Sequence, residues 1–241
     1  MKELSLFSGA GGGLLGTKLL GWEHCGYVEF SDYCQRVIAQ RIEDGFLDDA
    51  PIFGNIKAFL NEGYADAYQG MVDVVTAGFP CQPFSVAGKQ AGADDSRNLW
   101  PETLAVLRIV QPRFAYLENV PGLLAHEYAR RIFGDLAESG FDARWRVLSA
   151  AECGAPHKRE RLWILATNTS GPGLERCELP QRTQPAHPQP RDSCWWATEP
   201  NVGRVANGVA ARVDRLKALG NGQVPAVAAT AWGALKVSGV K

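Results

Sequence analysis

The sequence has no long apolar run and no cysteine arrangement that would hold a small fold together. In its 241 residues no stretch of 18 or more residues is both apolar and free of charges. Met1-Lys2-Glu3 leads directly into an apolar segment. These features argue against a membrane span and against a signal peptide. The six cysteines are scattered and form no disulfide framework, so we expect a reducing, cytoplasmic environment.

The cysteines also lack the spacing of a structural zinc site. No pair has the C-x₂₋₄-C arrangement, so we do not expect Cys177, His187 and Cys194 to bind zinc, and we predict no metal site. Internal repeats are absent as well. What remains is an ordinary composition, 46% hydrophobic and 21% charged, in a chain long enough for one domain with an attachment.

Net charge is small, but the charges are unevenly distributed along the chain. The whole sequence carries a formal charge of −1, whereas residues 158–217 hold ten Lys and Arg against six Asp and Glu. This segment therefore has a net charge of +4 and the remainder −5. A basic C-terminal third suits a polyanionic partner, although a solvated basic face would produce the same pattern.

Short apolar runs alternate with amphipathic stretches through the first two thirds of the chain. We expect strands at residues 4–7, 24–29, 72–76, 114–117, 143–148 and 162–166. We expect helices from a glycine-rich turn to residue 20, from a cap at Asp32 to residue 42, and at residues 99–110, 128–139 and 225–235. This alternation predicts an α/β fold with a doubly wound, mostly parallel sheet.

The composition changes after Thr167. Six of the fourteen prolines lie between residues 170 and 200, beside a Trp195-Trp196 pair. Such a stretch cannot form a central strand or a long helix. We therefore divide the chain into an α/β domain at 1–167, a Pro-rich segment at 168–204 and a C-terminal segment at 205–241 that returns to the domain.

A glycine-rich turn, Phe7-Ser8-Gly9-Ala10-Gly11-Gly12-Gly13, follows the first strand and opens a helix. Glycines here let the backbone approach a nucleotide and present free N–H groups to it. Glu29 ends the next strand, 18 residues beyond Gly11, where a carboxylate can accept both ribose hydroxyls. The pattern fits a dinucleotide and S-adenosylmethionine equally well, and a purely structural turn is a further reading.

A cysteine follows the strand at 72–76, in Gly78-Phe79-Pro80-Cys81-Gln82-Pro83-Phe84-Ser85. Open α/β sheets bind their ligands at the carboxyl ends of their strands, and a thiolate is the strongest side-chain nucleophile near neutral pH. A lone cysteine is more often a small buried hydrophobic residue. The two flanking prolines and the neighbouring glycine turn favour the nucleophile here.

Two further motifs supply candidate site residues, the first of them at the same edge of the sheet as Cys81. Glu118-Asn119-Val120-Pro121 ends the next strand, with a carboxylate able to exchange a proton with a ring nitrogen, or simply to cap a helix. His157-Lys158-Arg159-Glu160-Arg161 enters the last strand. It is either a surface cluster or the source of an arginine that holds a carbonyl oxygen.

In this order the motifs resemble those of the DNA cytosine-5 methyltransferases. The resemblance spans nearly the whole chain except residues 170–201, and Pro80-Cys81-Gln82 with Glu118-Asn119-Val120 are its most specific parts. It implies that Cys81 adds to carbon 6 of a flipped-out cytosine, that Glu118 pairs with N3 and that Arg161 holds O2, with Arg159 in the same catalytic group.

The resemblance also implies S-adenosylmethionine as the cofactor. Glu29 would bind the ribose, Phe30 would stack on the adenine, and Gly78 and Pro80 would line the methionine side. The complete set of implied cofactor residues is Phe7, Gly9, Ala10, Gly11, Glu29, Phe30, Asn55, Ile56, Gly78, Pro80, Leu99 and Asn221.

Three positions depart from the family pattern. Asn55 stands where an Asp often accepts from the adenine amino group, although the Asn carbonyl can accept as well. His157 replaces a usual Gln, and Gln223 stands where an aliphatic residue is more common. We expect neither His157 nor Gln223 to touch Cys81, Glu118 or Arg161.

The segment that reads the target sequence in this family is short here. Its arginines, Arg176, Arg182, Arg191 and Arg204, would contact phosphates or guanine edges, and we expect Trp195-Trp196 to anchor the segment rather than face DNA. We expect a monomer that acts on double-stranded DNA in a bacterial cell or a phage-infected host, with or without a restriction endonuclease partner. The alternatives are a tRNA cytosine-5 methyltransferase, a dinucleotide-dependent oxidoreductase and a catalytically silent DNA-binding relative.

Overall fold

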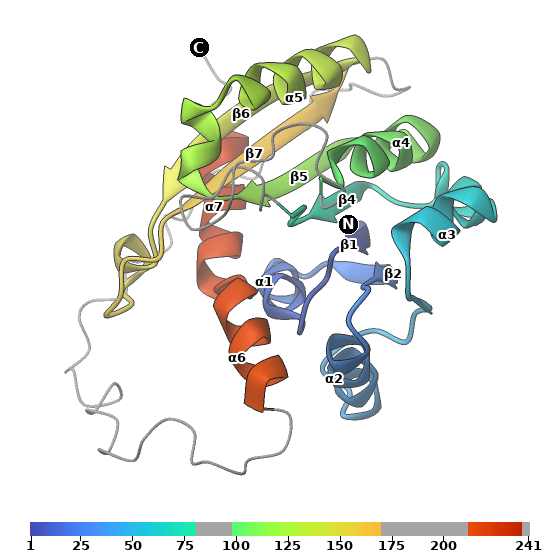
Figure 1. Ribbon diagram of the computed structural model, residues 1–241, viewed down its shortest axis with the longest axis vertical. Helices are drawn as coiled ribbons and strands as arrows, with labels where there is room; N and C mark the ends of the chain where they lie inside the picture. The colour runs from blue at the N-terminus through green and yellow to red at the C-terminus, as the bar shows by residue number, and fades with distance from the viewer. Residues whose placement is uncertain (81–97, 170–211, 238–241) are drawn as a thin grey trace.

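A computed structural model describes residues 1–80, 98–169 and 212–237 of the chain. The described residues form a seven-stranded sheet in the order β3-β2-β1-β4-β5-β7-β6 (Figure 1). Its strands are β1 (Lys2–Leu6), β2 (Glu23–Val28), β3 (Ile52–Phe53), β4 (Val74–Ala77), β5 (Phe114–Asn119), β6 (Phe141–Leu148) and β7 (Arg161–Asn168). β1 to β5 run parallel, and β7 is antiparallel to both β5 and β6. The predicted doubly wound, mostly parallel α/β sheet is confirmed.

Helices cover both faces of the sheet. They are α1 (Gly12–Leu19), α2 (Asp32–Glu43), α3 (Ile56–Asn61), α4 (Trp100–Val110), α5 (Glu127–Glu138), α6 (Arg212–Asn221) and α7 (Pro225–Val237). Three 3₁₀ turns lie at Tyr64–Tyr68, Pro121–Ala125 and Ala151–Cys153. α4 and α5 lie on one face and α1 and α7 on the other (Figure 1). None of the described helices combines the length and hydropathy needed to cross a bilayer.

Alternation along the strands builds a core on each face. On the side of α4 and α5, Leu4 and Leu6 of β1 are buried in the largest apolar cluster. On the opposite side, Trp163 of β7 stacks on Tyr116 of β5, with ring centroids 5.2 Å apart. The Tyr116 hydroxyl donates to the carbonyl of Ala228 in α7 at 2.7 Å. These contacts hold the C-terminal helix on the sheet, next to α1.

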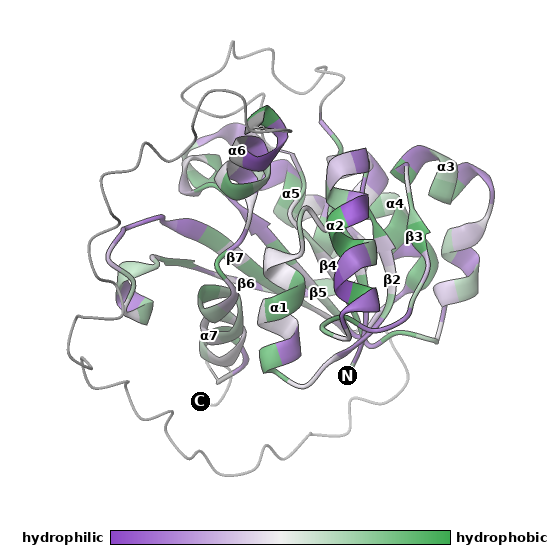
Figure 2. Cartoon of the chain, turned by 90° about the horizontal axis from the view of Figure 1, so that it is seen from below, coloured by the Kyte–Doolittle hydropathy of each residue, from purple (hydrophilic) through white to green (hydrophobic). Residues whose placement is uncertain are grey.

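Several elements differ from those expected. Ser31, not Asp32, caps α2, because its hydroxyl accepts from the amide of Cys34. β3 and α3 were not predicted, since two and six residues are too short to establish a periodicity. α6 was also missed, and two of its apolar residues, Val213 and Leu219, are exposed. Hydrophilic residues are prominent on both α2 and α6 (Figure 2). The Pro-rich segment and Trp195-Trp196 lie outside the described residues.

Candidate active site

One edge of the sheet collects most of the predicted functional residues. The glycine turn follows β1, Glu29 follows β2, Gly78 follows β4, and Glu118 lies near the end of β5. Because β7 runs antiparallel to β5, its first residue, Arg161, lies at the same edge. Ligands of open α/β sheets bind at this edge.

A hollow that is partly open to solvent lies between this edge and α1. Its walls come from the glycine turn, from the ends of β4 and β5, and from the segment that joins α6 to α7. The lining includes Phe7, Gly9, Gly78, Glu118 and Asn221, all of them predicted site residues.

The glycine turn is strongly bent. Phe7, Gly9 and Gly11 have φ angles of 55°, 56° and 88°, in the left-handed region that is costly for a side chain such as that of Phe7. The Glu29 carboxylate supports the turn: Oε2 accepts from the amide of Gly9 at 2.7 Å and Oε1 from the amide of Ser31 at 2.8 Å. Each carboxylate oxygen can accept further bonds, so these contacts leave capacity for ribose hydroxyls.

The two glycines that open α1 face protein rather than empty space. A Cβ on Gly12 would collide with the backbone of Gln223, and one on Gly13 with the Gln223 side chain. The sequence suggested that these glycines admit a nucleotide. The structure shows that they admit the segment between α6 and α7, which closes one side of the hollow.

Glu118 and Arg161 form an ion pair inside the site. Arg161 Nε donates to Glu118 Oε1 at 2.9 Å, and the side chains are 22% and 12% exposed for Arg161 and Glu118. Gln223 Nε2 donates to the other oxygen, Oε2, at 3.4 Å, so the expectation that Gln223 does not touch Glu118 is wrong. Burial raises the pKa of Glu118, while Arg161 and Gln223 oppose that rise without cancelling it. The carboxyl is therefore more easily protonated than an ordinary glutamate, which suits a proton donor.

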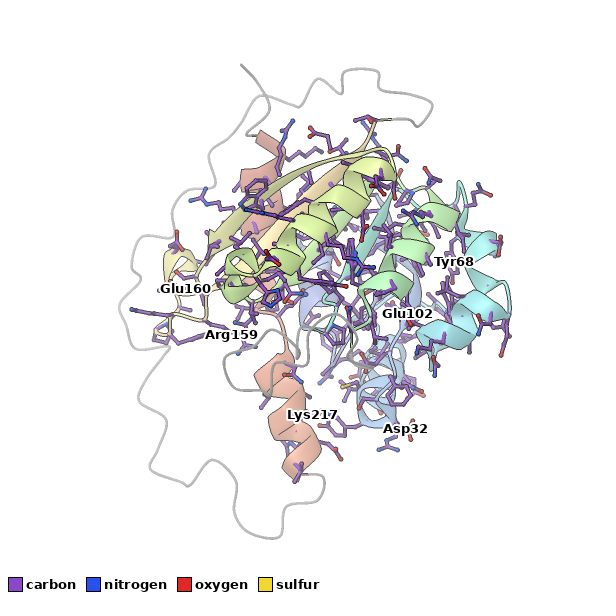
Figure 3. The ribbon with its side chains drawn as sticks, turned by 45° about the horizontal axis from the view of Figure 1, so that its top comes forward. Asp32, Tyr68, Glu102, Arg159, Glu160 and Lys217 are labelled. Atoms are coloured by element: carbon purple, nitrogen blue, oxygen red, sulfur yellow. The ribbon has the colours of Figure 1, made fainter. Side chains whose placement is uncertain are left out.

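Arg159 has a different set of partners. It has a left-handed backbone, with φ 39°, and its guanidinium donates to the carbonyls of Gly220 at 2.8 Å and Leu219 at 3.4 Å, and also to that of Gly222. Arg159 lies close to the end of α6 (Figure 3). Partial burial and the neighbouring Arg161 lower its pKa. The described contacts of Arg159 hold the end of α6 in place.

Some predicted cofactor residues do not line the hollow. The Asn55 side chain accepts from the amide of Lys57 at 2.8 Å and so caps α3, and Ile56 is buried in the apolar core. Leu99 precedes α4, and its carbonyl accepts from Thr103. Phe30 is 77% exposed directly after Glu29, with a ring available for stacking.

Two groups of predicted residues lie outside the part of the chain that the structure describes. Pro80 is the last described residue before the gap at 81–97, so the predicted nucleophile Cys81 falls within the gap. The gap at 170–211 contains Arg176, Arg182, Arg191 and Arg204. The predicted roles of these residues remain predictions.

Sequence reasoning missed the polar floor of the hollow. Glu3 and Ser5 of β1, Thr76 of β4 and Trp163 of β7 all line it. Among the described residues, Glu3 Oε2 and Trp163 Nε1 are buried without a hydrogen-bond partner. The signal was present in β1, where Glu3 and Ser5 alternate with Leu4 and Leu6 and place polar groups on one face.

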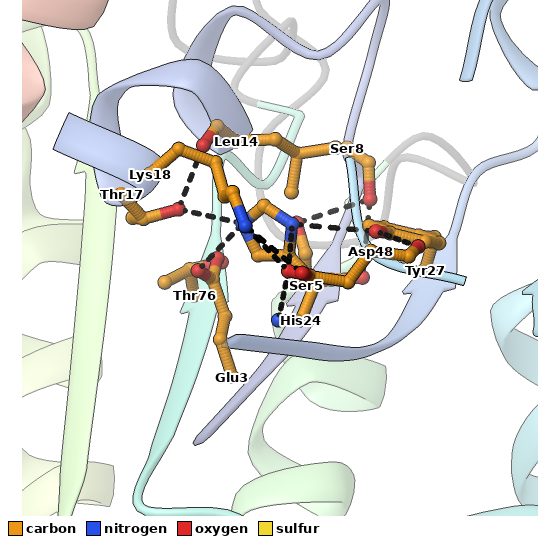
Figure 4. Close-up of polar contacts among 10 residues, drawn as sticks. All are labelled: Glu3, Ser5, Ser8, Leu14, Thr17, Lys18, His24, Tyr27, Asp48 and Thr76. Atoms are coloured by element: carbon orange, nitrogen blue, oxygen red, sulfur yellow. Dashed lines mark hydrogen bonds and ion pairs between the residues drawn. The ribbon is translucent and has the colours of Figure 1, made fainter. Parts of the chain in front are cut away.

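Glu3, which is part of this floor, also forms a buried acid–imidazole pair with His24 (Figure 4). Glu3 Oε1 accepts from the Thr76 hydroxyl at 2.6 Å, and Glu3 Oε2 lies 3.4 Å from Nε2 of His24. Burial raises the pKa of Glu3 to about 7. Burial also lowers the pKa of His24 to about 4. Both groups are therefore uncharged at pH 5 to 6, in contrast to a salt bridge.

Known proteins resemble this chain in sequence and in fold. The Type II methyltransferase M.NgoMIV of Neisseria gonorrhoeae is 32% identical over 187 residues, which are 76% of this chain and 57% of the relative. M.HpaII of Haemophilus parainfluenzae is 31% identical over 173 residues, 69% of this chain and 46% of that protein. The chain thus spans about half the length of the curated relatives it matches.

Solved structures support the fold assignment. The S. pombe Dnmt2 methyltransferase is similar with a TM-score of 0.55 and 21% identity, over 72% of this chain and 51% of that one. The family model for C-5 cytosine-specific DNA methylases matches residues 1–215. Together with the order of motifs along the sheet edge, this match shows that the chain belongs to the C-5 cytosine-specific DNA methylase family.

Proposed function

We propose that the protein transfers a methyl group from S-adenosylmethionine to carbon 5 of a flipped-out cytosine in DNA. The main support is the Glu118–Arg161 pair, which lies beside the hollow at the edge where β4 leads through Pro80 toward Cys81. Relatives named Type II methyltransferases favour DNA as the substrate.

The residues around the hollow suit S-adenosylmethionine. Glu29 would accept the ribose hydroxyls, the exposed Phe30 ring would stack on the adenine, and Gly78 would line the methionine side. The buried Trp163 Nε1, unpaired among the described residues, offers a donor to a ligand or a water molecule. When bound, the cofactor supplies an electrophilic methyl group.

The chain would supply the nucleophile. Carbon 5 of cytosine is weakly nucleophilic, and addition of the Cys81 thiolate at carbon 6 makes the ring enamine-like. After carbon 5 has been methylated, a base removes its proton, the electron pair reforms the ring double bond, and the carbon–sulfur bond breaks. The target base must leave the helix stack for this chemistry, at a cost of a few kcal/mol.

Glu118 would act at ring N3. Its raised pKa favours a protonated carboxyl, which can donate to N3 and stabilise the charge that develops when the thiolate adds. Arg161 keeps the carboxyl oriented through its Nε contact and supplies positive charge next to the ring. Arg159 would support this group by fixing residues 219–222.

The other proposed properties follow from the same assignment. Residues 1–167 would be the cofactor-binding and catalytic domain, 168–204 the target-recognition segment and 205–241 the segment that closes the pocket. We propose a monomer acting on double-stranded DNA in the bacterial cytoplasm, alone or beside a restriction endonuclease.

A substrate comparison tests the proposal. The protein is incubated with methyl-labelled S-adenosylmethionine and either duplex DNA or tRNA, and labelled 5-methylcytosine is measured after digestion. We expect labelled DNA, with its sites located by bisulfite sequencing. Label only in tRNA would replace DNA with RNA as the substrate, and no transfer together with selective NAD binding would favour an oxidoreductase.

A further inference from the structure

We infer that Gln223 is a positioning residue. It holds Oε2 of Glu118, the oxygen that Arg161 does not bind, and connects that carboxylate to the glycine turn. The inference deepens the proposed function, on which it rests for its catalytic meaning.

The first observation is that each oxygen of Glu118 has its own donor. Arg161 Nε binds Oε1 at 2.9 Å, and Gln223 Nε2 binds Oε2 at 3.4 Å. Two donors from different segments restrict rotation of the carboxyl group. Without the amide, Oε2 would lose a partner inside a largely buried site, where an unsatisfied acceptor is costly.

The second observation is that Gln223 is itself fixed. Its backbone carbonyl lies against Gly12 and its side-chain Oε1 against Gly13, both closer than a side chain at either glycine would allow. On the N-terminal side, Arg159 binds the carbonyls of residues 219, 220 and 222. On the C-terminal side, α7 is docked on the sheet by the bond from Tyr116 to Ala228. The amide therefore has little freedom to leave Glu118.

The third observation concerns Gly78, at the end of β4. A Cβ at this position would lie 3.1 Å from both Gln223 Nε2 and Glu118 Oε2. Glycine leaves the space in which the amide and the carboxylate meet. One side chain thus extends from the cofactor turn at its Oε1 end to the catalytic carboxylate at its Nε2 end.

The contact has an electrostatic consequence. The charged and titratable groups that face Glu118 among the described residues are Arg159, Arg161 and Tyr116. The two arginines and the Gln223 amide favour the ionised carboxylate, against the effect of burial. Removing the amide should therefore raise the pKa of Glu118 and leave its orientation to Arg161 alone.

The test compares Gln223→Met, Gln223→Glu and the surface control Gln69→Leu in the full chain. The pKa of Glu118 is followed by NMR of ¹³C-labelled glutamate, with its signal assigned through Glu118→Gln. Single-turnover methyl transfer is measured against pH, and S-adenosylmethionine binding is measured separately. Gln223→Glu keeps the size of the side chain, so the same three measurements on this variant test the inference if Gln223→Met does not fold.

We expect both Gln223 variants to raise the pKa of Glu118, the Glu variant more strongly because it adds a like charge. Methyl transfer should slow about tenfold, as expected for one lost hydrogen bond to a charged group, while cofactor affinity changes less than about threefold. Gln69→Leu should behave as the wild type does.

An unchanged Glu118 pKa and rate in both variants would overturn the inference. So would a loss of cofactor binding with an unchanged pKa, since Gln223 would then only close the pocket. If the variants raise the pKa but the wild type methylates no cytosine, the contact stands and the proposed function fails.

Discussion

Glu118 of β5 and Arg161 of β7 meet through Oε1 and Nε at 2.9 Å, although 43 positions of sequence separate them. The antiparallel return of β7 makes this contact, because it brings the start of that strand beside the end of β5. A largely buried carboxylate thereby gains a cation with a fixed geometry. The catalytic proposal depends on this pairing more than on any other described contact.

Arg161→Ala should therefore impair both activity and stability. Removing the cation leaves Glu118 buried with only the Gln223 amide and a more distant arginine, so its pKa should rise further. We expect a loss of about 1–3 kcal/mol in the free energy of unfolding, the range for a buried polar group that loses its hydrogen-bond partner. Methyl transfer should fall at least about a hundredfold if an oriented charge at the ring is lost.

Arg161→Lys is the matched control, because it keeps the charge but cannot reproduce the Nε contact. Chemical denaturation and single-turnover rates of both variants separate the two effects. Wild-type activity in Arg161→Ala would contradict a catalytic role for the pair.

Glu29 is predicted to contribute to both the turn and the cofactor. Glu29→Ala removes the acceptors for the amides of Gly9 and Ser31 and those proposed for the ribose. We expect S-adenosylmethionine binding to weaken by about 1.5–3 kcal/mol, the range for hydrogen bonds to a charged group. Isothermal titration calorimetry measures the loss, and Glu29→Gln, which keeps one acceptor oxygen, should lie between the alanine variant and the wild type. Equal affinity in all three proteins would refute the ribose contact.

Together, Glu3 and His24 should add almost no pH dependence to the free energy of unfolding between about pH 4.5 and 6.5. The pKa of Glu3 is raised to about 7, so the folded state retains a proton that the unfolded glutamate loses. The pKa of His24 is lowered to about 4, so the unfolded state takes up a proton that the folded imidazole does not. The two proton counts cancel in this interval.

Single substitutions should reveal the two opposing slopes. In Glu3→Gln only His24 titrates, and stability relative to the wild type should rise with pH through this interval, by up to about 1.4 kcal/mol per unit. In His24→Gln only Glu3 titrates, and relative stability should fall as pH rises, by a similar amount. Urea denaturation at several pH values measures both slopes. Parallel curves for the wild type and both variants would show that the pair does not titrate in this way.

Much of the sheet edge could be predicted from the sequence, because its residues follow strands whose alternation with helices is clear. Leu4 and Leu6 identify the first strand, and parallel strands must bring their carboxyl ends together. Glu118 could then be assigned to this edge. Arg161 begins its strand, so the strand pattern did not place it there, and only the antiparallel direction of β7 does so. The contact between Glu118 and Gln223 spans 105 residues and leaves no local pattern.

Two predicted site residues have local contacts that the sequence pattern did not indicate. β7 begins only at Arg161, and the left-handed backbone at Arg159 directs that side chain to the end of α6. Asn55 caps α3, as is typical of an Asn before a short apolar run, and its contact with adenine stays a prediction.

The central proposal is that Cys81 forms a covalent bond with the target cytosine, and trapping that bond tests it most directly. Duplex DNA containing 5-fluorocytosine is incubated with the protein and S-adenosylmethionine, and the mixture is analysed by denaturing electrophoresis and mass spectrometry. Fluorine cannot leave carbon 5 as a cation, so elimination is blocked and the thioether should persist. The account predicts an adduct at Cys81 in the wild type, and neither adduct nor turnover in Cys81→Ser, because a hydroxyl is a much weaker nucleophile at neutral pH. Absence of any adduct, with methylation retained in Cys81→Ser, would contradict it.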